Sequence, residues 1–113
     1  MTNDERQFLL TAAWMFMRHG QAARARAVCE AVVEENPRDG VASVALAALM
    51  LGAGEAPRAV EALRATDVPP ELAHAAAFLE ARALRMAGRD REAASRWSRY
   101  IESRKGAARR WTA

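Results

Sequence analysis

The sequence predicts an all-α protein of three helix hairpins stacked into a short right-handed solenoid. Two observations lead to this fold class. Alanine supplies 28 of the 113 residues, whereas there are only seven valines and one isoleucine, a balance that favours helices over strands. In addition, similar residues recur at an interval of 34 positions, which indicates a repeated structural unit.

The repeat consists of five aligned triplets. The alanines allow the two antiparallel helices of a unit to approach closely, and the glycines permit the left-handed turn that ends a first helix. The interval and the small-residue pattern resemble those of the tetratricopeptide repeat. The triplets are Gly20, Gly54 and Gly88; Ala25, Ala59 and Ala93; Ala13, Ala47 and Ala81; Phe16, Met50 and Leu84; and Cys29, Leu63 and Trp97.

Local signals predict the first hairpin and the start of the second. Thr2 and Glu5 have capping-box spacing, so a first helix should cover about residues 3–19. A second should cover about residues 21–35, because Asn36-Pro37 disfavours helical dihedrals. Asp39 can cap a third helix that continues to Leu51.

The remaining boundaries follow in the same way. Pro57 fits the first turn of a fourth helix that ends near Ala65. Pro69-Pro70 precede a fifth helix that ends near Ala87, and Asp90 can cap a sixth that ends near Arg104. We therefore expect one domain over residues 1–105, with units at about 6–39, 40–73 and 74–107, and a frayed basic tail over residues 106–113.

The positive charge is confined to the end of the chain. The formal net charge is +3, but the first 103 residues carry thirteen arginines against fourteen acids. Four positive side chains follow at Arg104, Lys105, Arg109 and Arg110. This distribution is not that of a nucleic-acid-binding face.

Other function classes lack support in the sequence. The longest nearly apolar run, residues 41–51, is far below the ~20 residues that a membrane span needs, and no signal peptide is evident. One cysteine, Cys29, and two distant histidines, His19 and His74, offer no metal-ligand spacing. No catalytic or phosphate-binding motif is present. We expect a non-enzymatic cytoplasmic protein without a cofactor or a metal.

The first helices of the hairpins are expected to line a concave groove. Mostly apolar side chains fall there, and a short chain has little core in which to hide them. Alternatively, Trp14, Met17 and Phe78 are ordinary core. Segment 41–51 is apolar all round, so a partner should cover what its neighbours leave open. The predicted binding residues are Gln7, Leu10, Trp14, Met17, Val41, Val44, Ala48, Leu51, Phe78, Arg82 and Arg85.

Such a groove suits an amphipathic helix or an extended apolar peptide from another protein. Trp14 is the first choice for an energetic hot spot, because buried tryptophans dominate such interfaces. Arg82 and Arg85 are expected to pair with carboxylates of the partner, which predicts binding that weakens with salt.

Several short motifs resemble the YscY-type chaperones of bacterial type III secretion. This resemblance implies a cytoplasmic chaperone that binds a small secreted YscX-like protein in the groove and helps it engage the cytoplasmic part of the export gate. The motifs are Arg6-Gln7-Phe8-Leu9-Leu10, Trp14, Gly20, Ala25, Asn36-Pro37 and Tyr100-Ile101-Glu102.

Three alternatives remain open. Needle-subunit co-chaperones are similar in size. A general repeat scaffold would self-associate through the same groove, and the free chaperone itself is also able to do so. A nucleic-acid-binding accessory protein would use the basic tail, with the steep salt dependence of phosphate contacts.

Overall fold

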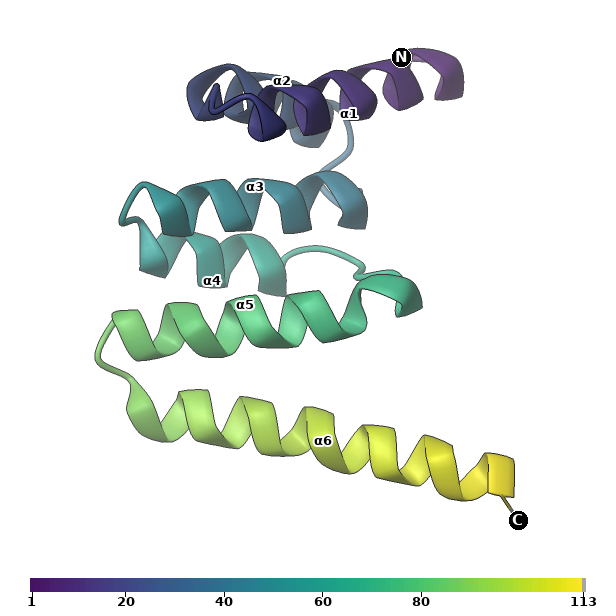
Figure 1. The fold of residues 1–113 in the computed structure, drawn as a ribbon, viewed down its shortest axis with the longest axis vertical. Helices are drawn as coiled ribbons and strands as arrows, with labels where there is room; N and C mark the ends of the chain where they lie inside the picture. Colours follow the sequence, from purple (N-terminus) through teal and green to yellow (C-terminus); the bar gives the residue numbers. More distant parts are fainter. Residues whose placement is uncertain (113) are drawn as a thin grey trace.

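The computed structural model describes residues 1–112, which form six α-helices and one short 3-10 helix. The helices stack in chain order, so that the termini lie at opposite ends (Figure 1). They pack in consecutive pairs, and the predicted all-α class with helix hairpins is confirmed. The elements are α1 (Asn3–Arg18), α2 (Ala22–Glu35), α3 (Gly40–Gly52), α4 (Ala56–Arg64), η1 (Pro70–Leu72), α5 (Ala73–Met86) and α6 (Asp90–Thr112).

Caps and turns follow the local signals. Thr2 accepts a hydrogen bond from the Glu5 backbone N–H and Glu5 accepts one from that of Thr2, which completes the capping box. Asp39 accepts from the Ala42 backbone N–H and caps α3. Gly20, Gly54 and Gly88 have φ of 71°, 79° and 79° at the three hairpin turns, a conformation that glycine adopts without steric cost. Asp90, expected as a cap, is instead the first residue of α6.

One core runs through all three hairpins. Ala13, Ala25, Ala47 and Ala59 are buried at the inner faces of the first two pairs, where their size permits close helix packing. Leu84 continues this core into the third hairpin. The regular 34-residue interval thus specifies a continuous interior.

The ends of the stack differ from its middle. Cys29 and Leu63 are buried, whereas Trp97, at the same repeat position, is only half-buried. A following hairpin covers the second helix of units one and two, and residues 1–112 contain none after α6. The repeat register therefore sets the direction of a side chain, and the neighbouring hairpin sets its burial.

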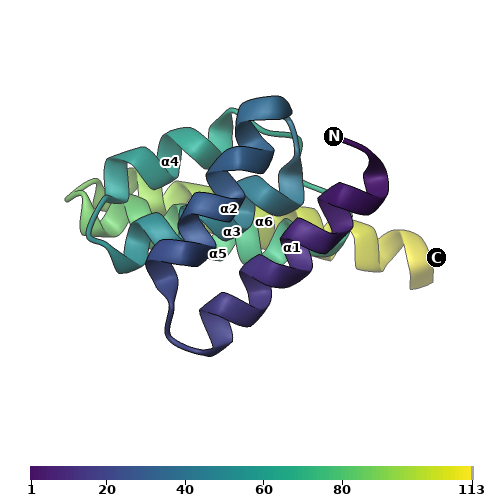
Figure 2. The same ribbon diagram turned by 90° about the horizontal axis from the view of Figure 1, so that it is seen from above.

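α6 is longer than predicted. It was expected to end near Arg104 but continues to Thr112, beyond the other helices (Figures 1 and 2). The frayed tail expected at residues 106–113 is therefore helical as far as the description reaches, and Ala113 lies outside it. Alanine and arginine are strong helix formers, which accounts for the extension. No helix among residues 1–112 has the length and apolarity of a membrane span.

Candidate functional site

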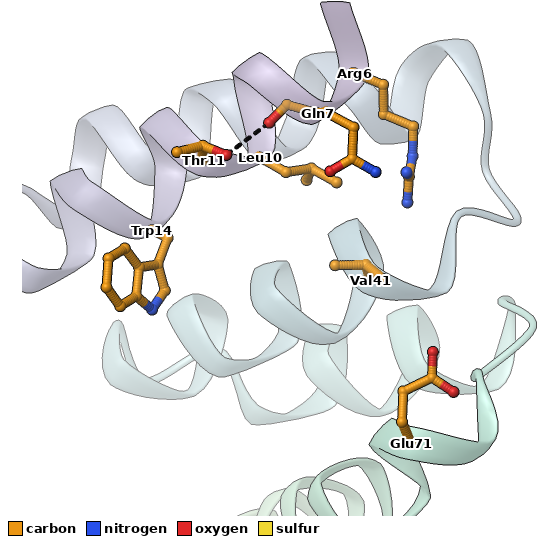
Figure 3. Close-up of a pocket in the computed structure, with 7 residues that line it drawn as sticks. All are labelled: Arg6, Gln7, Leu10, Thr11, Trp14, Val41 and Glu71. Carbon is orange, nitrogen blue, oxygen red and sulfur yellow. Dashed lines mark hydrogen bonds between the residues drawn. The ribbon is translucent and has the colours of Figure 1, made fainter. Parts of the chain in front are cut away.

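A first pocket of about 540 Å³ opens between α1 and the start of α3. Four of the predicted binding residues line it, namely Gln7, Leu10, Trp14 and Val41. In Figure 3 Gln7 and Leu10 of α1 lie above Val41, Trp14 lies to one side of this space, and Glu71 rises toward it from η1. The other lining residues are Arg6 and Thr11.

Trp14 is the largest apolar side chain of this pocket, and 55% of it is exposed. Arg18, one turn later on α1, places its guanidinium carbon 4.8 Å from the centre of the Trp14 ring. This cation–π contact holds one side of the indole. More than half of the Trp14 surface remains open, so the chain's own side chains do not fill the pocket at this point.

An ion pair fixes the polar edge of the same pocket. Arg6 donates two hydrogen bonds to the carboxylate of Asp39, of which the Nη2–Oδ1 bond measures 3.0 Å. The guanidinium lowers the pKa of Asp39 below its usual value, against the opposing effect of burial. Because this pair joins α1 to the cap of α3, it sets the distance between the pocket walls, and it also neutralises the charge of Arg6.

A second pocket of about 520 Å³ lies between α5 and α6. Three further predicted residues line it: Phe78, Arg82 and Arg85. Phe78 is 50% exposed and packs edge-on against Trp97, with ring centres 6.4 Å apart. Because aromatic rings and guanidinium groups share this pocket, it can bind an apolar side chain and a carboxylate together.

Arg82 and Arg85 differ from many other arginines of the protein. Seven arginines among residues 1–112 are described in ion pairs with acidic side chains, as in the Arg26–Glu55 and Arg38–Asp67 pairs. Within residues 1–112, neither Arg82 nor Arg85 has a hydrogen bond or an ion pair, although both are exposed at the second pocket. Their charges are therefore available to a partner.

The middle of the predicted groove differs from the expectation. Val44 and Leu51 are only 7% exposed and belong to the core. Their assignment as surface binding residues is corrected, because α3 packs against α2, α4 and α5, which cover most of it. Ala48 is half-buried, and Met17 is exposed but lines neither pocket. Most of the apolar surface of α3 is thus covered by the chain itself rather than left for a partner.

Six lining residues were not among the predicted binding residues, namely Arg6, Thr11 and Glu71 at the first pocket and Ala81, Ala93 and Trp97 at the second. Thr11 is a polar residue of α1, and the binding residues predicted for this helix were mostly apolar. Glu71 reaches the first pocket from η1, which follows a Pro-Pro pair and obeys no helical register. Trp97 shares its repeat position with Cys29 and Leu63, and this alignment predicted that Trp97 would be buried.

Residues 1–112 contain no group of side chains that could hold a metal ion. No three His, Cys, Asp or Glu side chains gather there. Cys29 is fully buried, and burial raises the pKa of its thiol, which disfavours the reactive thiolate. His74 contacts the hydroxyl of Tyr100 at 3.2 Å in an aromatic cluster with Trp97.

Comparison with known families identifies the repeat. Residues 16–71 match the tetratricopeptide repeat family. The matched segment extends from the end of α1 to η1 and thus contains the second hairpin and both turns that flank it. A tetratricopeptide repeat indicates a role in protein–protein interaction, which agrees with two exposed pockets that combine apolar and charged side chains. The comparison with curated proteins gave no match.

Proposed function

We propose that this tetratricopeptide repeat protein is a non-enzymatic bacterial chaperone that binds and masks an apolar helical segment of another protein. The observation that carries the proposal is Trp14, more than half exposed in a pocket built from predicted binding residues. An exposed tryptophan in a concave site is a typical anchor for a partner. An amphipathic helix laid into a groove is a common way to bury such surface.

The free energy favours a complex in which a partner replaces the water on the exposed apolar side chains. Val41 and Phe78 are 39% and 50% exposed, and burial of apolar surface stabilises a complex by ~25 cal/mol per Å² before the costs of association. A client that binds only the folded chain also stabilises it by mass action. Masking a client and stabilising the chaperone are thus two effects of one contact.

The finer proposal is a chaperone of type III secretion, in the bacterial cytoplasm, with a small YscX-like export substrate as its client. The resemblance of the N-terminal motifs, with Trp14 among them, supports this assignment. The client would then be presented to the cytoplasmic part of the export gate. The competing roles are a needle-subunit co-chaperone and a scaffold that self-associates. They differ in the protein that binds the groove, which for the scaffold is a second copy of this chain.

Co-purification with a candidate client tests the proposal. The wild type and Trp14→Asp would each be co-expressed with a candidate YscX-like client. We expect the wild type alone to retain the client, because a carboxylate in place of the indole leaves a charge in an apolar interface. Met15→Asp is the matched control, since Met15 is also about half exposed on α1 but does not line the pocket.

Two results would contradict the proposal. Equal client retention by Trp14→Asp and wild type would remove the pocket from the interface. Light scattering that shows stable oligomers of the purified chain, dispersed by Trp14→Asp, would instead support the scaffold. Circular dichroism of both variants checks that the helices remain.

A further inference from the structure

The two pockets carry free charges of opposite sign. Arg82 and Arg85 contribute two unpaired positive charges to the pocket of α5 and α6. At the first pocket Arg6 is neutralised by Asp39, and Glu71 has no hydrogen bond or ion pair among the described residues. Among the lining residues, the free charge is therefore negative at the first pocket and positive at the second, while Arg18, which stacks on Trp14, adds a positive charge beside the first pocket. A charged ligand that reached both pockets would have one favourable orientation.

A single helix is comparable in length to the stack of hairpins. The described chain measures 41 × 36 × 24 Å, and a helix of ~20 residues spans ~30 Å. Leu10 and Phe78 occupy equivalent places in units one and three, as do Trp14 and Arg82. In unit two the residue equivalent to Trp14 and Arg82 is Ala48, which is small and half-buried. A helical segment would meet no bulky side chain at that position.

The composition of the second pocket indicates which group its arginines bind. Within residues 1–112, Arg6 and Arg38 each bind a carboxylate through two hydrogen bonds, an arrangement that suits the planar guanidinium group. Phe78 and Trp97 also line this pocket, so a partner seated on these rings would exclude water from the two arginines. In such surroundings a charge pair is stronger than on an open surface.

We infer that the bound segment is an amphipathic helix with an acidic end, oriented so that its carboxylates meet Arg82 and Arg85 while its other end lies near Glu71. This inference rests on the proposed groove and deepens it by stating the charge pattern and the direction of the client. A phosphate-rich partner would also meet two arginines. However, Glu71 would repel a uniformly negative chain, so we favour the mixed-charge helix.

Synthetic peptides of defined charge test the inference. The first probe is an amphipathic helical peptide of ~21 residues with a leucine stripe, glutamates in the turn at one end and lysines in the turn at the other. The second has glutamine at all those charged positions. A single-stranded thymidine oligonucleotide is the third. Fluorescence anisotropy with the full chain measures each dissociation constant.

Charge reversal at the second pocket should act on the charged peptide alone. We expect Arg82→Glu with Arg85→Glu to weaken the charged peptide at least ~10-fold and the glutamine peptide less than ~3-fold. The matched control is Arg91→Glu with Arg99→Glu, because both arginines are exposed on α6, have no described partner, do not line the second pocket and change the net charge equally. This control should bind the charged peptide as the wild type does.

Orientation requires a separate measurement. A nitroxide label at the glutamate end of the charged peptide would broaden nearby amide resonances of the isotope-labelled protein. We expect stronger broadening for residues 78–97 than for residues 6–14, and the reverse for a label at the lysine end. Equal or opposite broadening would overturn the stated direction.

The remaining outcomes separate the inference from the proposed function. Equal affinity for the charged and the glutamine peptide, with both lost in Trp14→Asp, would overturn the charge pattern and leave the apolar groove intact. No binding of either peptide, together with client binding that survives Trp14→Asp, would overturn both. Tight binding of the oligonucleotide, abolished by the Arg82/Arg85 double variant, would replace the helix with a nucleic acid.

Discussion

At the scale of single residues, Gly40 is the glycine most constrained by its neighbours. It is the first residue of α3, and the connection after α4 crosses directly over it. A Cβ atom at this position would lie 2.1 Å from the carbonyl oxygen of Asp67 and 2.5 Å from Cδ of Pro69. Both contacts are far inside van der Waals distance, so any larger residue would push the connection away from α3.

Gly40→Ala should therefore destabilise the protein. We expect a loss of about 2 kcal/mol or more in the free energy of unfolding, because backbone and a proline ring must move. Gly52→Ala provides the control, since nothing lies within 4 Å of the added Cβ, and alanine gains ~0.5–1 kcal/mol over glycine in a helix. Urea denaturation measures both. Equal stability of the two variants would show that the connection yields without cost.

Asp39 combines two roles in one buried carboxylate. It caps α3 through the Ala42 backbone N–H and accepts both hydrogen bonds of the Arg6 guanidinium from α1. The cap is a local feature, while the ion pair joins residues 33 positions apart in the sequence. The same side chain thus stabilises one helix and the contact between two hairpins.

Asp39→Ala should cost about 2–3 kcal/mol in the free energy of unfolding, from the lost cap and from an arginine left without its partner. Asp67→Ala is the comparison, because the Arg38–Asp67 pair is also bidentate but lies on the surface; we expect less than ~1 kcal/mol there. Thermal unfolding followed by circular dichroism distinguishes the two. A small effect at Asp39 would mean that the hairpins associate without this pair.

At the level of helices, ion pairs between hairpins make the association sensitive to acid. Glu55, at the start of α4, accepts hydrogen bonds from Arg26 of α2, which lower its pKa from 4.5 to about 2. Arg6 lowers the pKa of Asp39 in the same direction. In the unfolded chain both carboxyls would have ordinary pKa values, so the folded state binds fewer protons below pH 5.

Stability should consequently fall as the pH decreases. A carboxyl whose folded-state pKa is depressed contributes its full stabilisation above the unfolded pKa, here about 4 to 4.5, and loses it as the pH falls toward 2. Urea midpoints measured between pH 7 and pH 3 should decrease mainly below pH 5. The double variant Asp39→Asn with Glu55→Gln should be less stable at pH 7 and show a flatter profile. If the pH profile of the double variant ran parallel to that of the wild type, the acid sensitivity would come from other groups.

For the whole molecule, a continuous core couples the three hairpins. A single cluster of buried side chains extends from Ala13 of α1 to Ala93 of α6, with Leu84 completely buried within it. Repeat proteins gain stability from the contacts between adjacent units. An array this short has few such contacts, so no hairpin should remain folded alone.

We therefore expect one cooperative unfolding transition. Leu84→Ala should reduce the free energy of unfolding by about 3 kcal/mol, although Leu84 belongs to the last hairpin. Far-ultraviolet circular dichroism reports all helices, and tryptophan fluorescence reports the surroundings of Trp14, Trp97 and Trp111. Both signals should shift to the same lower urea midpoint. Separate midpoints would show that the third hairpin unfolds on its own.

Local chemistry made most of the fold predictable. Caps and prolines placed the helix boundaries to within a few residues at all but the end of α6, and the spacing of Gly20, Gly54 and Gly88 located the three left-handed turns. These features depend on contacts within one turn of helix or one hairpin. Seven of the eleven predicted binding residues also line the two pockets, because a 34-residue register keeps equivalent side chains on the same side of each hairpin.

Burial and charge pairing, by contrast, were decided by the packing of one hairpin on another. Val44 and Leu51 are covered because α3 has neighbours on several sides, while Trp97 remains half-buried at the open end of the stack. Arg6 reaches an acid 33 residues away, whereas Arg82 reaches none. A periodic sequence repeats the direction of its side chains but not their surroundings, since these depend on which unit lies next to them in space.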